Sequence, residues 1–135
     1  MPKIAIIIPC YNEEKRLSFE NIKELIESSE LQIFFANDGS TDNTKQLINS
    51  ICNQIPRCEA IHFDENEGKS TTIYKAIHYI VDQNLYDYIG YFDADFSTPV
   101  NELLQIVNRL NSETIPFIFA SRIKTLNAKI TRKVH

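Results

Sequence analysis

The stretch Ile4-Ala-Ile-Ile-Ile8 decides the fold of this 135-residue chain. It is apolar at every position, so a strand formed here needs apolar cover on both of its faces. The centre of a parallel sheet with helices packed on either side provides that cover. Pro9 ends the apolar run well short of the roughly 20 residues that a membrane-spanning helix needs. The stretch therefore predicts a buried central strand.

Short apolar runs alternate with longer segments of helical period along the rest of the chain. Strands are predicted at 4–8, 31–36, 59–63, 88–92 and 117–120. Apolar stripes between them predict four helices, with the stripes at Ile22, Leu25 and Ile26, at Leu47, Ile48, Ile51 and Ile55, at Ile73, Ala76, Ile77, Ile80 and Val81, and at Val100, Leu103, Leu104, Val107 and Leu110. This alternation predicts an α/β fold, a Rossmann-like open and mainly parallel sheet with helices on both faces.

Residues with short polar side chains predict where three of the helices begin. Ser18 and Thr41 precede the first and second stripes and are suited to be N-caps. Thr98 precedes Pro99, and proline is favoured at the first position of a helix.

Composition and charge limit the classes of protein that fit. With 43% hydrophobic and 24% charged residues, the chain is expected to form one soluble domain, at 1–121, followed by a basic tail at 122–135. The tail holds five basic residues and no acidic one, which leaves nine basic against 18 acidic residues in the body. An acidic body disfavours nucleic-acid binding, which needs Lys and Arg to neutralise phosphates. The tail is either a solvated terminus or a contact for an acceptor phosphate or anionic lipid headgroups.

The cysteines and two of the histidines are expected to be structural. Cys10, Cys52 and Cys58 have no spacing that suggests a zinc site, and we expect reduced thiols in a cytoplasmic protein. His62 and His78 fall on a predicted strand and a predicted helix, where we expect them to fill space rather than to bind a ligand.

Asp93 and Asp95 directly follow the apolar run that ends at Phe92. Residues two apart on a strand point to the same side, so we expect the two carboxylates to share one side of the sheet edge. Neighbouring carboxylates repel each other unless a cation joins them, and Mg²⁺ or Mn²⁺ prefers such oxygen ligands. The pair predicts a divalent metal site, although Asp-x-Asp by itself is common in surface loops.

Polar clusters also follow the other predicted strands, at the edge where α/β proteins bind ligands. Tyr11 is either an ordinary half-buried aromatic residue or a surface for a nucleobase. Asp38 is either a turn residue or an acceptor for the N–H groups of a base. Lys69 is either a solvated lysine or a phosphate ligand at a helix start. A P-loop is excluded, because the Walker pattern needs a glycine five positions before Gly68, where the chain has Phe63.

Five motifs, in order along the chain, resemble those of family 2 glycosyltransferases with the GT-A fold, and the nearest branch looks like the polyprenyl-phosphate (dolichyl-phosphate) sugar transferases. The motifs are Ile6-Ile-Ile-Pro-Cys-Tyr-Asn-Glu-Glu14, Asn37-Asp-Gly-Ser-Thr-Asp-Asn-Thr44, Asn66-Glu-Gly-Lys69, Tyr91-Phe-Asp-Ala-Asp-Phe-Ser-Thr-Pro99 and Ser121-Arg122. The resemblance implies an inverting hexosyltransferase that uses a UDP- or GDP-sugar and Mg²⁺ or Mn²⁺. Its acceptor would be a polyprenyl phosphate, and the full-length protein would be cytoplasmic and associated with a membrane surface.

The resemblance also implies roles for residues at matching positions. Pro9, Tyr11 and Glu13 look like contacts to the base and ribose of the donor. Asp38 looks like the carboxylate that binds the base, and Lys69 belongs to the family's Gly-Lys element beside the donor.

Asp93 and Asp95 match the family's Asp-x-Asp, the catalytic pair that holds the ribose and the metal-bound diphosphate. Ser70 stands where members of the family usually have glycine, which changes how closely the backbone approaches the donor. The family's catalytic domain normally continues well beyond the Asp pair and contributes the acceptor contacts. We therefore expect this chain to be the donor-binding part of a longer enzyme, with weak or no activity in isolation.

Three rival functions stay open at this point. A non-catalytic nucleotide-sugar-binding module would bind the donor without transferring the sugar. A nucleotidylyltransferase-like enzyme usually has a glycine-rich loop after the first strand, where this chain has Pro9-Cys-Tyr-Asn-Glu13. A flavodoxin-like or receiver domain also holds Mg²⁺ with acidic residues at strand ends, but it would show no preference for nucleotide sugars.

Overall fold

The computed structural model describes residues 2–112, in which strands and helices alternate from β1 to α4. The elements are β1 (Ile4–Cys10), α1 (Phe19–Glu27), β2 (Gln32–Asp38), α2 (Thr44–Gln54), β3 (Cys58–Phe63), α3 (Lys69–Gln83), β4 (Tyr88–Tyr91) and α4 (Val100–Ser112). The strand predicted at 117–120 and the basic tail at 122–135 lie outside the described residues. None of the helices in residues 2–112 combines the length and the apolar character that crossing a bilayer requires.

The four strands form one parallel sheet in the order β3-β2-β1-β4. The chain winds outward from β1 through β2 to β3, then returns to the other side of β1 to form β4. The strand order therefore reverses between β1 and β4. Open α/β sheets bind their ligands at such a point, beyond the carboxyl ends of the strands.

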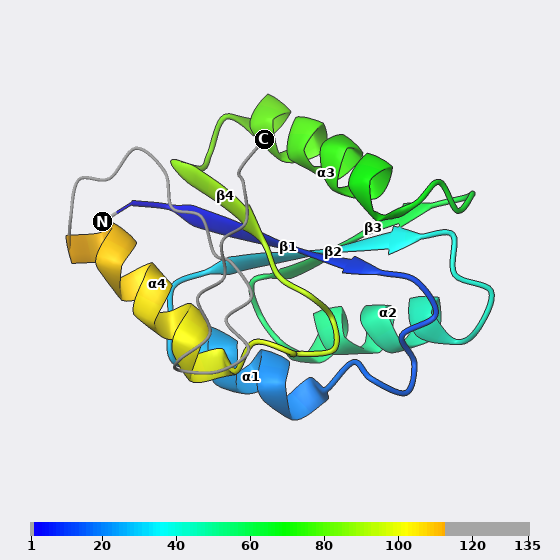
Figure 1. The fold of residues 1–135 in the computed structure, drawn as a ribbon, viewed down its shortest axis with the longest axis horizontal. Helices are drawn as coiled ribbons and strands as arrows, with labels where there is room; N and C mark the ends of the chain where they lie inside the picture. Colours follow the sequence, from blue (N-terminus) through cyan, green and yellow to red (C-terminus); the bar gives the residue numbers. More distant parts are fainter. Residues whose placement is uncertain (1, 113–135) are drawn as a thin grey trace, which may run out of the picture.

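Helices cover both faces of the sheet, with α3 on one face and α1, α2 and α4 on the other (Figure 1). Side chains of β1 alternate between the two cores: Ala5 and Ile7 face α3, whereas Ile6 and Ile8 face the three-helix side. The whole stretch Ile4–Ile8 is buried. The predicted central strand and the predicted α/β architecture are both confirmed.

Two of the predicted helix starts agree with the structure to within one residue. Ser18 is the N-cap of α1, and its hydroxyl oxygen accepts a hydrogen bond from Asn21 N at 3.2 Å. α4 begins at Val100, one residue later than expected, and the carbonyl of Pro99 accepts a hydrogen bond from Leu103 N at 3.3 Å.

The prediction that Thr41 caps α2 is wrong. The helix begins at Thr44 with Asn43 as its N-cap, and Asp42 Oδ1 accepts from Thr44 N at 2.9 Å. Thr41 N instead donates to Asn12 Oδ1 at 2.8 Å, a contact between residues 29 positions apart. The loop after β1 thus binds Thr41, the residue that the sequence pattern predicts as the N-cap of α2.

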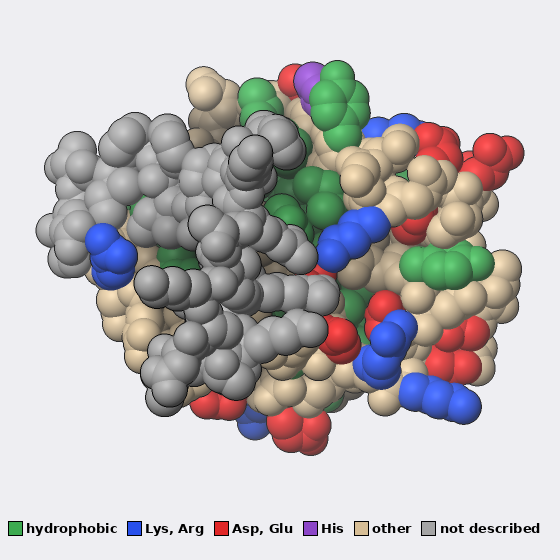
Figure 2. All heavy atoms as spheres, in the orientation of Figure 1, with side chains coloured by type: hydrophobic (Ala, Val, Ile, Leu, Met, Phe, Trp, Pro, Cys, Tyr) green, Lys and Arg blue, Asp and Glu red, His purple; other side chains and the backbone are tan. Residues whose placement is uncertain are grey.

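The predicted apolar stripe of α3 is only partly right. Thr72, Ala76 and Ile80 are buried, whereas Ile77 is 37% exposed and Val81 is 55% exposed. Figure 2 shows hydrophobic side chains and a histidine on the surface over this helix. Because α3 carries apolar residues on two sides, the hydrophobic pattern does not tell which side packs on the sheet.

Two isoleucines in α3 provide a matched test of which face is buried. Ile80→Ala is expected to lower the free energy of unfolding by about 2–4 kcal/mol, because it opens a cavity under the helix. Ile77→Ala removes the same atoms from a partly exposed position and should cost about 0.5 kcal/mol. Urea unfolding of both variants measures the difference, and equal losses would contradict the assignment of the buried face.

Candidate functional site

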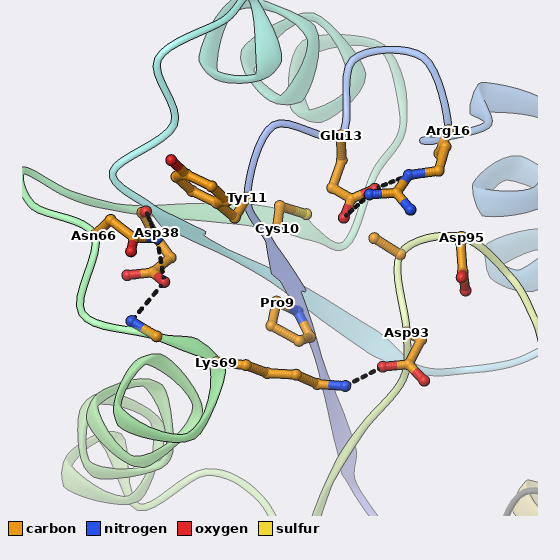
Figure 3. Close-up of a pocket in the computed structure, with 12 residues that line it drawn as sticks. Pro9, Cys10, Tyr11, Glu13, Arg16, Asp38, Asn66, Lys69, Asp93 and Asp95 are labelled. Atoms are coloured by element: carbon orange, nitrogen blue, oxygen red, sulfur yellow. Dashed lines mark hydrogen bonds and ion pairs between the residues drawn. The ribbon is translucent and has the colours of Figure 1, made fainter.

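A pocket of about 450 Å³ opens at the carboxyl edge of the sheet (Figure 3). It is formed by the end of β1 with the loop that follows, the end of β2, the loop before α3 and the turn after β4. All seven residues predicted for the site line this pocket, namely Pro9, Tyr11, Glu13, Asp38, Lys69, Asp93 and Asp95. The fold therefore brings together side chains from four distant segments of the sequence.

Asp93 and Asp95 lie in a turn after β4 and not on the strand, because β4 ends at Tyr91. Phe96 N donates to the carbonyl of Asp93 at 3.1 Å, and Phe96 has a positive φ of 53°. Strand alternation therefore does not set the direction of the two carboxylates, and the prediction that it does is wrong. Both residues line the pocket nonetheless.

Lys69 connects the start of α3 to this turn. It is the first residue of the helix, and its ammonium group forms an ion pair with Asp93 Oδ1. The same ammonium lies 5.5 Å from the centroid of the Tyr91 ring. Asp95 is exposed, and its Oδ1 accepts a hydrogen bond from Ser97 N at 3.0 Å. The turn thus presents two carboxylates beside one cation at a helix N-terminus, where anions are favoured.

Glu13 and Arg16 form a second ion pair, on the side of the pocket away from Lys69 (Figure 3). Arg16 Nη2 donates to Glu13 Oε1 at 3.0 Å, and Arg16 Nε lies 2.9 Å from Oε2. Oε2 is buried and accepts no hydrogen bond from residues 2–112. Burial raises the pKa of Glu13; Arg16 partly offsets this rise, whereas Asp95 and Asp42 add to it. Arg16 is not among the residues that the sequence predicts for the site. The only feature of the sequence that points to it is its charge, which is opposite to that of Glu13 three residues earlier.

Asp38 is the last residue of β2, and only 3% of its surface is exposed. Its Oδ1 accepts from Glu67 N at 2.8 Å, and its Oδ2 accepts from Gly68 N at 3.0 Å and from Asn66 Nδ2 at 2.9 Å. The carboxylate is thus bound by the loop that precedes α3. That Asp38 binds a base stays a prediction.

Two glycines allow this loop to approach the end of β2. Gly39 has a φ of +62°, and a Cβ there would lie 2.5 Å from Asn66 N and 2.5 Å from the carbonyl carbon of Glu65. Gly68, the N-cap of α3, has a φ of +94°, which L side chains rarely adopt. The loop and the strand end therefore pack backbone against backbone.

Tyr11 provides the one large aromatic surface among the described residues that line the pocket. Its side chain is 43% exposed, and Figure 3 shows the ring on the same side of the pocket as Asp38 and Asn66. A flat ring exposed in this way can stack against another ring.

His62 and the cysteines behave as structural residues, as expected. His62 Nδ1 lies 3.0 Å from Asn37 Nδ2, and Nε2 lies 2.8 Å from Asn49 Oδ1, which fits a neutral ring protonated at Nε2. Burial raises the pKa of Cys52 to about 11 and that of Cys58 to about 12, so both thiols are protonated at neutral pH. Burial also raises the pKa of the Cys10 thiol.

The pocket residues fit a divalent cation that binds together with an anionic ligand. Within residues 2–112, no three or more His, Cys, Asp or Glu side chains are grouped so as to enclose a metal ion. Two carboxylates, those of Asp93 and Asp95, stand at the pocket edge. This donor set suits Mg²⁺ or Mn²⁺, which keep several waters and take further oxygens from substrate phosphates.

Comparison with known proteins identifies related sequences. The model of the family "Glycosyl transferase family 2" matches residues 5–133. The "Prophage bactoprenol glucosyl transferase homolog" of Escherichia coli K12 is 24% identical over 135 residues, which is 97% of this chain and 43% of that protein. The "Bactoprenol glucosyl transferase" of Shigella phage SfX is 23% identical with the same coverage. The chain thus spans less than half the length of these relatives.

Solved structures with similar folds include two glycosyltransferases. The mannosyltransferase PcManGT from Pyrobaculum calidifontis, solved with GDP-Man and Mn²⁺, has a TM-score of 0.65 and 20% identity, covering 81% of this chain and 32% of that one. The S. aureus TarS fragment 1–349, solved with UDP, has a TM-score of 0.54 and 21% identity, covering 69% of this chain and 27% of that one. The likeness concerns the fold, and the expected GT-A fold is confirmed.

Removal of the Arg16 charge tests the electrostatics of Glu13. In Arg16→Met, the ionised Glu13 carboxylate loses its cation, and we expect the free energy of unfolding to fall by about 1 kcal/mol at neutral pH. Because the pKa of Glu13 is raised, this carboxylate takes up its proton above the ordinary Glu value of 4.5, and the neutral group has no charge for Arg16 to stabilise. The loss of stability should therefore shrink as the pH falls and vanish below 4.5. Urea unfolding between pH 4 and 7 measures this dependence.

The exposed neighbour Lys15 provides the control. Lys15→Met removes the same charge without touching Glu13 and should leave stability nearly unchanged across this pH range. A loss in Arg16→Met that is independent of pH would show that the side chain acts by packing alone.

Proposed function

The chain belongs to glycosyl transferase family 2, and from that premise we propose that it is the donor-binding part of an inverting glycosyltransferase. It binds a UDP- or GDP-sugar at the carboxyl edge of the sheet and takes part in transferring the sugar to an acceptor, for which we propose a polyprenyl phosphate. The observation that carries the proposal is one pocket, at the point of strand-order reversal, in which Asp93, Asp95 and Lys69 stand together.

The nucleoside is assigned to the side of the pocket that holds Tyr11. The exposed ring of Tyr11 suits stacking of the base, and Pro9, near the end of β1, lines the same pocket. The buried Oε2 of Glu13 has no hydrogen bond within the described residues and is suited to accept one from a ribose hydroxyl. We therefore assign Pro9, Tyr11 and Glu13 to the base and ribose, as the sequence predicts.

The diphosphate is assigned to the other end of the pocket. Asp93 and Asp95 would hold a Mg²⁺ or Mn²⁺ ion, which when bound stabilises negative charge on the leaving diphosphate. Lys69 adds a fixed positive charge at the N-terminus of α3, where a phosphate group is also favoured by the helix dipole. Its ion pair with Asp93 keeps this ammonium at the pocket edge.

The proposed reaction is a direct displacement at the anomeric carbon. An acceptor oxygen forms a bond to this carbon on the face opposite the diphosphate, while the bond to the phosphate oxygen breaks and its electron pair leaves with the nucleoside diphosphate. An acceptor phosphate is already an anion, so this step needs no general base to remove a proton. The preorganised charges of the pocket then favour departure of the leaving group.

The related proteins support parts of this proposal. PcManGT was solved with GDP-Man and Mn²⁺, and the TarS fragment with UDP, which supports a nucleotide donor and a divalent metal. The relatives named for bactoprenol support a polyprenyl acceptor and action at a membrane surface. A donor-binding fragment without activity of its own is the second candidate, because the chain matches only 43% of those relatives.

Loss of one acidic residue of the Asp pair is expected to weaken donor binding. Calorimetric titration with UDP-, GDP-, CDP- and TDP-sugars, each with and without Mn²⁺, identifies the donor. In the presence of Mn²⁺, Asp95→Ala should bind the preferred donor at least about tenfold more weakly, because the metal loses an oxygen ligand.

The matched control is Asp64→Ala, which removes an exposed carboxylate that does not line the pocket. It should bind the donor as the parent chain does. Equal affinity of the parent chain in Mn²⁺ and in chelator would refute the metal assignment.

A further inference from the structure

Asn12 connects the loop after β1 with the loop after β2. Its side-chain oxygen accepts hydrogen bonds from Thr41 N at 2.8 Å, from Thr41 Oγ1 at 3.4 Å and from Asp42 N at 3.4 Å. Its own backbone N–H donates to Ser40 Oγ at 3.0 Å. The backbone and the side chain of Asn12 thus bind the same short segment, residues 40–42.

The segment that Asn12 binds is itself attached to buried parts of the fold. Ser40 Oγ donates to Asn37 Oδ1 at 2.5 Å, and Asn37 lies in β2 with only 2% of its surface exposed. Next to Asn12, Glu13 N donates to Thr44 Oγ1 at 2.8 Å, and Thr44 is the buried first residue of α2. The loop after β1 is therefore held in place by buried groups of β2 and α2.

The backbone of Asn12 forms a turn between two residues of the pocket. Its φ is +52°, in the left-handed region, where asparagine is tolerated better than most L residues. Tyr11 precedes this turn and Glu13 follows it, and Figure 3 shows their side chains directed to different parts of the pocket. Asn12 itself is partly buried and does not line the pocket. The conformation at this one residue therefore sets the directions of both neighbours.

We propose that Asn12 is a positioning residue, which fixes the turn that presents Tyr11 and Glu13 to the nucleoside of the donor without touching the donor itself. The inference rests on the proposed function for the identity of the ligand. Within the described residues, the hydrogen bonds of Asn12 involve neither Lys69 nor the turn after β4. Loss of its side chain should therefore weaken binding of the nucleoside and spare binding of the diphosphate.

Replacement by glycine removes the side-chain acceptor and keeps the backbone conformation, because glycine adopts a positive φ without strain. In the presence of Mn²⁺, we expect Asn12→Gly to bind UDP or GDP, whichever the parent chain prefers, about tenfold more weakly. Inorganic pyrophosphate has no nucleoside, and its affinity should stay within about twofold of the parent value. Calorimetric titration measures both. An equal loss for pyrophosphate, or an unchanged affinity for the nucleoside diphosphate, would overturn the proposal.

Asn84 provides a matched control, because it has the same left-handed backbone conformation, with a φ of +53°, at the end of α3 opposite to the pocket. Asn84→Gly removes the same side chain and should change neither affinity. A loss as large as that of Asn12→Gly would contradict the proposal. If Asn12→Gly does not fold, Ser40→Ala removes the acceptor of the Asn12 N–H and should show the same pattern at smaller size.

Amide hydrogen exchange tests these contacts without any nucleotide, so failure of the proposed function stays distinguishable from failure of this inference. The Thr41 and Asp42 amides should exchange at least about tenfold faster in Asn12→Gly, whereas amides in β1 should keep their protection. Unchanged exchange at both residues would overturn the inference, whether or not a nucleotide binds. Faster exchange in a chain that binds no nucleotide would support the role of Asn12 in fixing the turn and contradict only the proposed function.

Discussion

Burial of β1 on both of its faces is the constraint on which the rest of this structure depends. Ile6 and Ile8 pack toward α1, α2 and α4, whereas Ala5 and Ile7 pack toward α3, so helices must lie on both sides of the sheet. Parallel strands need crossover connections, and α1, α2 and α3 provide them. All four strands consequently end at the same edge, and the return from β3 to β4 leaves the strand-order reversal beside β1. The pocket follows from this arrangement.

Two of the four acidic residues that line the pocket are paired with a cation. Lys69 pairs with Asp93 at the turn after β4, and Arg16 pairs with Glu13 after β1. Acidic residues outnumber basic ones in the chain as a whole, so these two cations matter for any anionic ligand that enters. The pairs would also help this acidic pocket to accept the diphosphate proposed as its ligand, because each cation offsets a carboxylate that would repel it. A metal ion held by two carboxylates would add to the same balance.

The loop before α3 links the two ends of the pocket. Asp38 and Gly39 fix it to β2, and Lys69 follows it at the helix start. The chain belongs to glycosyl transferase family 2, and the two ends of the pocket match the layout of the donor proposed for it. A nucleotide sugar has a base at one end and a diphosphate in the middle. The chain spans less than half the length of the relatives named for bactoprenol.

The sequence by itself determined the central strand, the order of strands and helices, and seven of the residues that line the pocket. The elements follow from local patterns, because strand and helix periodicity is read within one segment and parallel strands end at one edge. Among the seven pocket residues, Pro9 and Glu13 were indicated only by the family resemblance. Only the tertiary structure decided the partners of these residues. The backbone N–H of Thr41 donates to the side chain of Asn12, and the carboxylate of Asp38 accepts hydrogen bonds from residues 66–68. One face of α3 packs against the sheet. Each of these depends on a contact between segments about 30 positions or more apart in the chain, which no local pattern encodes.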